Sequence, residues 1–307
     1  MSGRRASSRQ VRAAETMKLE AVRAMKVPDL SVIIVWDAGH AIARMMEANQ
    51  RWFRSHNVEV LIINGGEDQR RLRELLVPAG PLSLGMVRLP VPCNHALGIN
   101  IGMQFSRSRK LLLLGPNHVL QSDLIGKAIQ VLNDDAYLRA TTVSMPDAES
   151  YWPRIKEQCG SNVAIRSILT RRTLKATFAD GIEVEVEASA SELVENTRSA
   201  VSVIAVKKQD LGRIGGYNSD IQWAEWISAD VQLRLKKISG LKCVQDGEIV
   251  KLRDSETPAG RSRSMTDEFF ELNLLCERYS RGDVWGTYSR DIGLWRNKLQ
   301  IDWINPS

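Results

Sequence analysis

The stretch LSVIIVWDAGHAIARMMEANQRWFRSHNVEVLIIN, residues 30–64, decides the fold class. It begins with a continuous apolar run, Leu30–Trp36, and ends with a second one, Val58–Asn64. Runs of this kind are typical of strands that are buried on both faces of a sheet. The pattern between them, over about 42–55, is helical, and so is the pattern over 67–76. This order of strand, helix, strand and helix predicts a mostly parallel sheet flanked by helices.

Polar residues stand at the ends of both strands. Asp37 follows the first strand directly, and Asn64 closes the second. In parallel α/β sheets, ligands bind beyond the carboxyl ends of the strands. We therefore expect Asp37 and Asn64 to lie at a binding site.

The rest of the chain carries similar signals. A buried strand is expected over 110–120, with a break at Gly115-Pro116-Asn117. Alternation around Asp180-Gly181 predicts a hairpin within 174–188. Other predicted elements are strands at 86–89, 200–208, 241–245 and 248–253, and helices at 95–107, 123–132 and 265–279.

The charge of the chain is concentrated at its beginning. The formal net charge is +6, and residues 1–28 contain seven Lys or Arg and two Glu, seven minus two, or +5. A basic leader of this kind suits contact with a polyanion such as nucleic acid or anionic lipid. The alternative is a solvated tail or a surface helix. The remainder is close to neutral, which argues against a dedicated nucleic-acid-binding body.

Composition excludes several other classes of protein. The four cysteines and four histidines show no metal-ligand or disulfide spacing. No window approaches the run of about 18 apolar residues that a membrane span needs. The leader lacks the apolar core of a secretory signal, so we expect a cytoplasmic protein with no membrane span.

A second informative stretch is RIGGYNSDIQWAEWISADVQLRL, residues 213–235. Its glycine pair allows a tight turn or the close approach of a ligand. Trp223, Trp226 and Asp230 follow at helical spacing, so they share one side of a helix. A carboxylate beside two indoles suits a site that binds a sugar and deprotonates its hydroxyl. The alternative is a buried tryptophan cluster, with Asp230 stabilised at the positive end of a helix that begins near Ser228.

The apolar residues of the same stretch fall on a neighbouring face of that helix. They are Ile227, Val231, Leu235 and Ile238. We expect this face to anchor the helix to the core.

Five segments in chain order resemble the inverting nucleotide-sugar glycosyltransferases of GT-A fold, the large group that contains chondroitin- and cellulose-type synthases. The segments are SVIIVWDAG, VEVLIINGGEDQ, Asn100-Ile101-Gly102, LLLLGPNHVL and IGGYNSD…WISADVQLRL. The resemblance covers roughly 30–240. It implies a mixed, mostly parallel, Rossmann-like sheet over 29–250, with a nucleotide-binding half, 29–125, and an acceptor half, 126–250. Residues 251–307 would form a helical C-terminal extension.

The resemblance also implies a reaction. A sugar would move with inversion from a nucleotide donor, expected to be UDP-linked, to a hydroxyl of the acceptor. That acceptor could be a saccharide, a natural product, a protein or a nucleic acid. Asp230 takes the place of the catalytic base, the second acid of the family's Glu-Asp pair, and Ala229 replaces the glutamate.

The remaining site residues implied by the resemblance fall into two groups. The nucleotide-binding residues are Val35, Trp36, Asp37, Asn64, Gly66, Asn100, Pro116 and Asn117. The residues that would contact the acceptor or the sugar are Gly215, Gly216, Tyr217, Trp223, Glu225 and Trp226.

The family's metal-binding Asp-x-Asp is degenerate here. Gly115-Pro116-Asn117 stands in its place and has no carboxylate, so Mg²⁺ or Mn²⁺ has little support as a cofactor. Lys251 and Arg253 lie where many members have a metal-binding histidine, and they are expected to neutralise the diphosphate instead. Three hypotheses therefore stay open: a metal-independent transferase, an inactive GT-A-like nucleotide-binding or scaffold protein, and a transferase that reaches nucleic acid through the leader.

Overall fold

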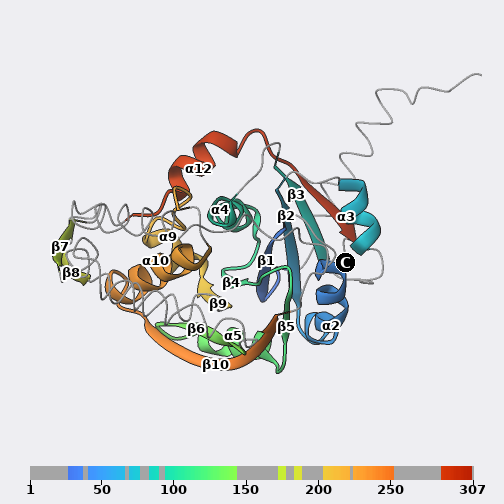
Figure 1. The fold of residues 1–307 in the computed structure, drawn as a ribbon, viewed down its shortest axis with the longest axis horizontal. Helices are drawn as coiled ribbons and strands as arrows, with labels where there is room; N and C mark the ends of the chain where they lie inside the picture. The colour runs from blue at the N-terminus through green and yellow to red at the C-terminus, as the bar shows by residue number, and fades with distance from the viewer. Residues whose placement is uncertain are drawn as a thin grey trace, which may run out of the picture.

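The computed structural model describes residues 27–36, 41–65, 69–76, 83–89, 94–143, 172–177, 183–188, 203–221, 224–251 and 285–305. Most of these residues build one nine-stranded sheet with helices on both faces (Figure 1). Residues 1–26 of the basic leader and the helix expected at 265–279 lie outside the described residues.

The elements follow the predicted order closely. The strands are β1 (Leu30–Trp36), β2 (Val58–Asn64), β3 (Ser83–Arg88), β4 (Lys110–Leu113), β5 (His118–Leu120), β6 (Ala136–Val143), β7 (Arg172–Thr177), β8 (Glu183–Ala188), β9 (Ile204–Lys207), β10 (Lys242–Lys251) and β11 (Ile301–Asn305). The helices are α2 (Ala41–Ser55), α3 (Gln69–Leu76), α4 (His95–Phe105), α5 (Leu124–Val131), α9 (Lys208–Arg213), α10 (Ala224–Lys237) and α12 (Tyr288–Trp295).

The main sheet is mixed, with a parallel centre. Its strand order is β11-β3-β2-β1-β4-β9-β6-β10-β5. Strands β3, β2, β1 and β4 run parallel, whereas β9 is antiparallel to both β4 and β6. Strand β10 runs parallel to β6, and the edge strands β5 and β11 are antiparallel to their neighbours. The predicted fold class, a mixed and mostly parallel α/β sheet flanked by helices, is confirmed.

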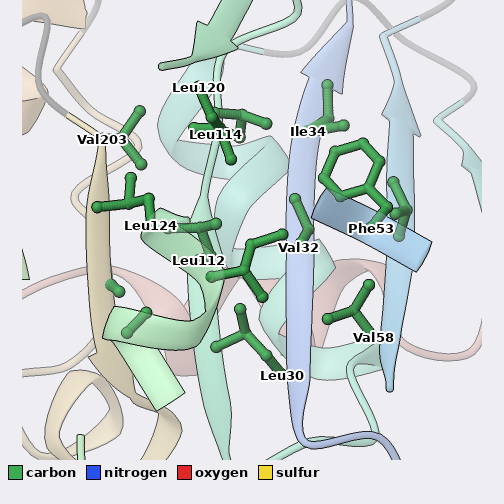
Figure 2. Packing of buried hydrophobic residues seen from close by; sticks show 14 of the residues in the cluster. Leu30, Val32, Ile34, Phe53, Val58, Leu112, Leu114, Leu120, Leu124 and Val203 are labelled. Atoms are coloured by element: carbon green, nitrogen blue, oxygen red, sulfur yellow. The ribbon is translucent and has the colours of Figure 1, made fainter. Parts of the chain in front are cut away.

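Two hydrophobic clusters cover the two faces of the sheet, because alternate residues of each buried strand point to opposite sides. Helices α2, α3 and α5 pack on one face, where Leu30, Val32 and Ile34 of β1 meet Phe53 of α2 and Leu124 of α5 (Figure 2). Helices α4, α9, α10 and α12 pack on the other face (Figure 1).

The apolar face predicted for α10 lies in this second cluster. Ile227, Val231, Leu235 and Ile238 are all buried there. The prediction that these residues anchor the helix to the core is therefore confirmed.

One predicted pair of strands differs from expectation, and one predicted break in a strand is confirmed. The two strands expected at 241–245 and 248–253 form one strand, β10, with an irregularity between Gln245 and Glu248. Gly247 lies in that irregularity with φ of 80°. The predicted strand at 110–120 is divided into β4 and β5, with the break at the expected Gly-Pro-Asn step.

The C-terminal extension is more than helical. It contains helix α12, but it also contributes β11, which pairs antiparallel with β3 and extends the main sheet. The sequence did not predict this strand, because five residues with one apolar run carry little signal on their own. Among the helices that the structure describes, none is long and apolar enough to cross a membrane.

Candidate functional site

The carboxyl ends of β1, β2 and β3 form one edge of the candidate site. Trp36 is in register with Asn64, and Asn64 with Arg88. Backbone hydrogen bonds continue just beyond the strand ends: Gly65 N donates to Trp36 O and Leu89 N donates to Asn64 O, both at 2.9 Å. The structure thus brings the ends of these strands together, as predicted. Asp37 and Gly66 lie outside the described residues.

The side chains at this edge are largely inside the protein. Trp36 is 1% exposed and belongs to the cluster on the α2 side, whereas Val35 packs against α4. Asn64 is fully buried. A nucleotide bound at this edge would therefore contact backbone atoms and could not stack on the buried indole of Trp36.

A compact turn, Gly115–His118, lies where the resemblance would place a metal-binding Asp-x-Asp motif. His118 N donates to Gly115 O at 3.1 Å, and Gly115 N donates to His118 Nδ1 at 3.0 Å. A Cβ on Gly115 would lie 2.6 Å from Cε1 of the imidazole, so the ring fills the space of any side chain at that position.

The turn is anchored to α2 by a buried amide. Asn49 Nδ2 donates to His118 O, and Asn49 Oδ1 accepts from Leu120 N, each at 2.8 Å. Sequence reasoning missed Asn49 and His118. Asn49 lies on the apolar side of a predicted helix, and this was the available signal. A buried amide needs hydrogen-bond partners, so its position indicated a contact with another segment.

Lys251 meets this turn across two strands. Strand β10 pairs antiparallel with β5, and this register sets Lys251 opposite His118 and one residue from Asn117. Paired residues of antiparallel strands have Cα atoms about 4.5–5.5 Å apart. The structure therefore brings together Asn117 and Lys251, two positions that lie far apart in the chain. Arg253 lies outside the described residues.

This donor set does not fit a hard divalent cation. The turn offers no carboxylate, and the residue opposite it is a lysine. Within the described ranges, no group of three or more His, Cys, Asp or Glu is placed to hold a metal ion. Mg²⁺ and Mn²⁺ bind mainly carboxylate and other oxygen ligands, which this turn lacks.

The glycine pair lies in a loop, Ile214–Tyr217, that we call the glycine loop. Gly215 and Gly216 have φ of 77° and 71°, values that favour glycine. The tight approach at this loop comes from the protein's own chain, since a Cβ on Gly286 would collide with the carbonyl oxygens of Gly215 and Gly216. Close packing of backbone on backbone accounts for Gly215 and Gly286, whereas a Cβ on Gly216 would collide with the side chains of Tyr288 and Asn100.

The C-terminal segment is bonded to the glycine loop along its length. Gly286 N donates to Ile214 O at 3.1 Å, and Tyr288 N donates to Gly215 O at 2.9 Å. Thr287 N donates to Tyr217 O at 2.9 Å. The backbone of the loop is engaged by residues 286–288. Its predicted contact with the acceptor stays a prediction.

The side chain of Asn100 is hydrogen-bonded inside the fold. Its Oδ1 accepts from Tyr217 N at 2.8 Å, and its Nδ2 donates to Tyr217 O at 3.0 Å and to Asp291 Oδ2 at 2.8 Å. Both amide N–H groups of the fully buried side chain are therefore used inside the fold. These bonds join α4 to the glycine loop and α12. A role of Asn100 in nucleotide binding stays a prediction.

Asp291 completes this connection from α12. Its Oδ1 accepts from Ser219 Oγ at 2.9 Å, and its Oδ2 lies 2.9 Å from Thr287 Oγ1. The carboxylate is 3% exposed, and hydrogen bonds from several donors compensate its burial. No sequence pattern singled out Asp291.

Asp230 is buried and ion-paired. It is 3% exposed, and its Oδ2 accepts from Arg234 Nε at 3.1 Å and from Arg234 Nη2 at 2.5 Å. A general base must come within about 2.6–3.2 Å of the proton it takes, although unliganded geometry alone does not exclude a candidate. The base role of Asp230 stays a prediction, and the structure adds an ion pair that the sequence did not reveal.

The other predicted acceptor residues divide into two groups. Tyr217 is buried within the cluster on the α4 side, and burial raises the pKa of its hydroxyl. For Trp223 no structure is described, and for Glu225 and Trp226 only the helical backbone of α10 is described. Whether the indoles share a face with Asp230 stays a prediction.

The protein thus has a mixed α/β fold, a glycine loop whose backbone is bonded within the fold, and a turn without carboxylates near the carboxyl ends of the parallel strands. No family model and no curated protein matches the sequence. Among solved structures, it is similar to the mannosyltransferase PcManGT from Pyrobaculum calidifontis, in complex with GDP-Man and Mn²⁺, with 12% identity, a TM-score of 0.48, and coverage of 93% of this chain and 83% of that one.

A second similar structure is TarS of S. aureus, with 10% identity and a TM-score of 0.48. The match covers 80% of this chain but only 38% of TarS. At such identities and TM-scores, neither likeness says anything about the reaction.

Proposed function

We propose that the protein is an inverting glycosyltransferase that moves a sugar from a nucleotide-sugar donor, expected to be UDP-linked, to an acceptor hydroxyl. The observation that supports this best is the ordered set of motifs over 30–240 that resembles this family. Three of the five motifs lie on strands β2, β1 and β4, which run parallel and end at one edge of the sheet.

In this proposal, the donor binds at that carboxyl edge. The nucleotide borders the ends of β1 and β2 at Trp36 and Asn64, with Asp37 and Gly66 assigned by the resemblance. The diphosphate lies against the Gly115–His118 turn. That location agrees with the rule that ligands of parallel α/β sheets bind beyond the carboxyl ends of the strands.

We propose that donor binding is independent of a metal ion. The turn has no carboxylate for a cation, and Lys251 is in register with its last residue. An ammonium group can neutralise the charge of a leaving diphosphate, as a metal ion does. Arg253 is proposed as the second cation on the basis of the resemblance.

The proton of the acceptor hydroxyl would be taken by Asp230, the base implied by the resemblance. Asp230 would act as a buried carboxylate whose Oδ2 accepts hydrogen bonds from Arg234. The acceptor hydroxyl would then attack the anomeric carbon in line with the departing diphosphate, and a single displacement of this kind inverts the configuration.

Calorimetry with UDP, GDP, TDP and CDP, each with EDTA and with Mn²⁺, tests the donor proposal. We expect one diphosphate to bind equally well in both conditions. Lys251→Ala should then weaken that diphosphate about tenfold, while the matched nucleoside binds as before. Lys242→Ala, an exposed lysine at the other end of β10, is the matched control.

Two outcomes would contradict this proposal. Binding that requires Mn²⁺ would mean that metal ligands lie elsewhere in the chain. No binding of any diphosphate would favour the second candidate, an inactive GT-A-like scaffold. That candidate is favoured by one observation, the engagement of Asn100 and the glycine loop within the fold.

A transferase that acts on nucleic acid is a separate possibility, which depends on the leader alone. The leader falls outside the described residues, apart from Val27 and Pro28. Removal of residues 1–28 with unchanged affinity for a DNA duplex would exclude it.

A further inference from the structure

Arg234 is a completely buried arginine whose role the sequence did not indicate. It is 1% exposed and lies in the last turns of α10. Charged side chains are almost never fully buried unless they are paired, so a buried arginine needs a set of partners inside the protein. The structure supplies these partners from two different elements.

The first set of partners is the glycine loop. Arg234 Nη1 donates to Ile214 O and to Gly216 O, both at 2.7 Å. Two carbonyls two residues apart converge on one nitrogen here, in a loop whose glycines both have positive φ. The guanidinium therefore binds the loop in one particular backbone conformation.

The second partner is the carboxylate of Asp230. Nε and Nη2 of the same guanidinium both donate to Asp230 Oδ2. The planar fork of arginine fixes the angle between these two sets of bonds, which a lysine ammonium does not reproduce. One side chain thus holds the conformation of the loop and the orientation of the acid together.

We propose that Arg234 is a positioning residue of the acceptor side, which sets the glycine loop and Asp230 in their working arrangement. The proposal rests on the proposed function, in which the glycine loop and Asp230 serve the acceptor. Arg234 would act without touching a substrate, because its donors face Asp230 and the loop carbonyls.

The test compares the full chain with Arg234→Met, Arg234→Lys and the exposed neighbour control Lys236→Met. Hydrogen exchange at the amides of residues 215–217 reads the loop directly. Turnover of UDP-glucose with glucose as acceptor reads the reaction, and calorimetry with UDP reads the donor site.

In Arg234→Met we expect exchange at 215–217 to accelerate about tenfold or more while β1 and β2 stay protected. We also expect the KM for glucose to rise about tenfold, with Kd for UDP unchanged. Arg234→Lys should fall between this variant and the native protein. Lys236→Met should match the native protein in every readout.

A second variant keeps the proposal testable if Arg234→Met does not fold. Gly286→Ala displaces the carbonyls of Gly215 and Gly216 while the guanidinium of Arg234 is kept. It should give the same split, with a higher KM for glucose and an unchanged Kd for UDP.

Two results would overturn the proposal. One is native protection at 215–217 in Arg234→Met. The other is a rise in the Kd for UDP as large as the rise in the KM for glucose, which would mark a general loss of structure. If the native protein binds UDP but turns over no UDP-glucose, the proposed reaction fails, and the exchange data still decide whether Arg234 holds the loop.

Discussion

Two buried ion pairs, Asp230–Arg234 and Glu59–Arg107, hold different parts of the molecule, and their comparison bears on the proposed site. In both, an arginine binds a carboxylate that is almost wholly inside the protein. Glu59 is the second residue of β2, so it lies near the amino ends of the strands, away from the edge where ligands bind. A buried, arginine-paired acid is therefore not in itself a sign of catalysis in this fold.

The two pairs differ in their arginines. Arg107 is 21% exposed, and its guanidinium lies 4.6 Å from the centre of the Trp303 ring. Arg234 is 1% exposed and reaches no surface. The energetic consequences of breaking each pair should follow from this difference, since a charge that can reach water loses little when its partner is removed.

The largest effect is expected from the arginines themselves. Arg234→Met leaves Asp230 buried without its cation and removes the donor of two loop carbonyls. We expect it to lower the free energy of unfolding by about 3–5 kcal/mol. Arg107→Met should cost about 1.5–3 kcal/mol, the value of a hydrogen bond to a charged group.

The smaller cost at Arg107 has a structural reason. Glu59 retains Ser31 Oγ at 2.5 Å and the backbone N of residue 107 at 2.6 Å, and the charge of Lys208 is close enough to interact with it. Urea unfolding of both variants measures the difference. Equal losses would mean that the partners remaining around Glu59 contribute nothing.

Removing the acids should give the next largest effect. Asp230→Asn removes the carboxylate charge paired with the fully buried Arg234, although the amide oxygen can accept one of its bonds. We expect a loss of about 3 kcal/mol, against about 1–2 kcal/mol for Glu59→Gln, because Arg107 can turn toward water. The same two variants, measured by urea unfolding and by turnover, separate the possible roles of Asp230.

Turnover decides between a base and a counter-ion. If Asp230 is the base, Asp230→Asn abolishes transfer, whereas Glu59→Gln retains it and UDP binding is unchanged in both. If Asp230 serves only Arg234, the double variant Asp230→Leu with Arg234→Met should recover stability and part of the turnover, since removing both charges together can be nearly neutral.

The comparison also shows what sequence patterns can and cannot predict. The apolar runs of β1 and β2 and the helical periodicity of α2 predicted the centre of the sheet, because burial on both faces leaves a continuous apolar signal. The break at Gly115-Pro116-Asn117 was predicted for a similar reason, since these residue types disfavour a continuing strand. Local pattern was sufficient wherever the structure depends on neighbours in sequence.

The site was harder to predict because its partners are distant in the chain. Asn100 bonds to Tyr217 and Asp291, which lie 117 and 191 residues away. The glycine pair suggested a ligand, but the approaching group is Gly286. Asp230–Arg234 has a local spacing, i and i+4, but even there periodicity does not reveal burial.

A glycine substitution tests whether residues 286–288 shape the glycine loop as Arg234 does. Gly286→Ala introduces a methyl group against the carbonyls of Gly215 and Gly216, so we expect a loss of about 1–3 kcal/mol from overpacking. Gly293→Ala is the matched control, because its new Cβ meets nothing within 4 Å and alanine favours the helix. A loss at Gly293 equal to that at Gly286 would show that the cost is not specific to the loop.

The smallest effect is expected from an exposed ion pair, which provides the baseline for both buried ones. Arg73 and Asp302 are paired at 3.3 Å, joining α3 to β11, with side chains 52% and 42% exposed. Arg73→Gln should cost less than about 1 kcal/mol, because water screens the pair and both side chains lose conformational freedom when it forms.

In 1 M salt, where the screening length is about 3 Å, even this cost should vanish. The costs of Arg234→Met and Arg107→Met should persist there, because ions do not enter a site that water does not reach. If instead the cost of Arg234→Met faded with salt as the cost of Arg73→Gln does, Arg234 would have to be open to solvent in solution, and it could no longer be the residue that fixes the glycine loop.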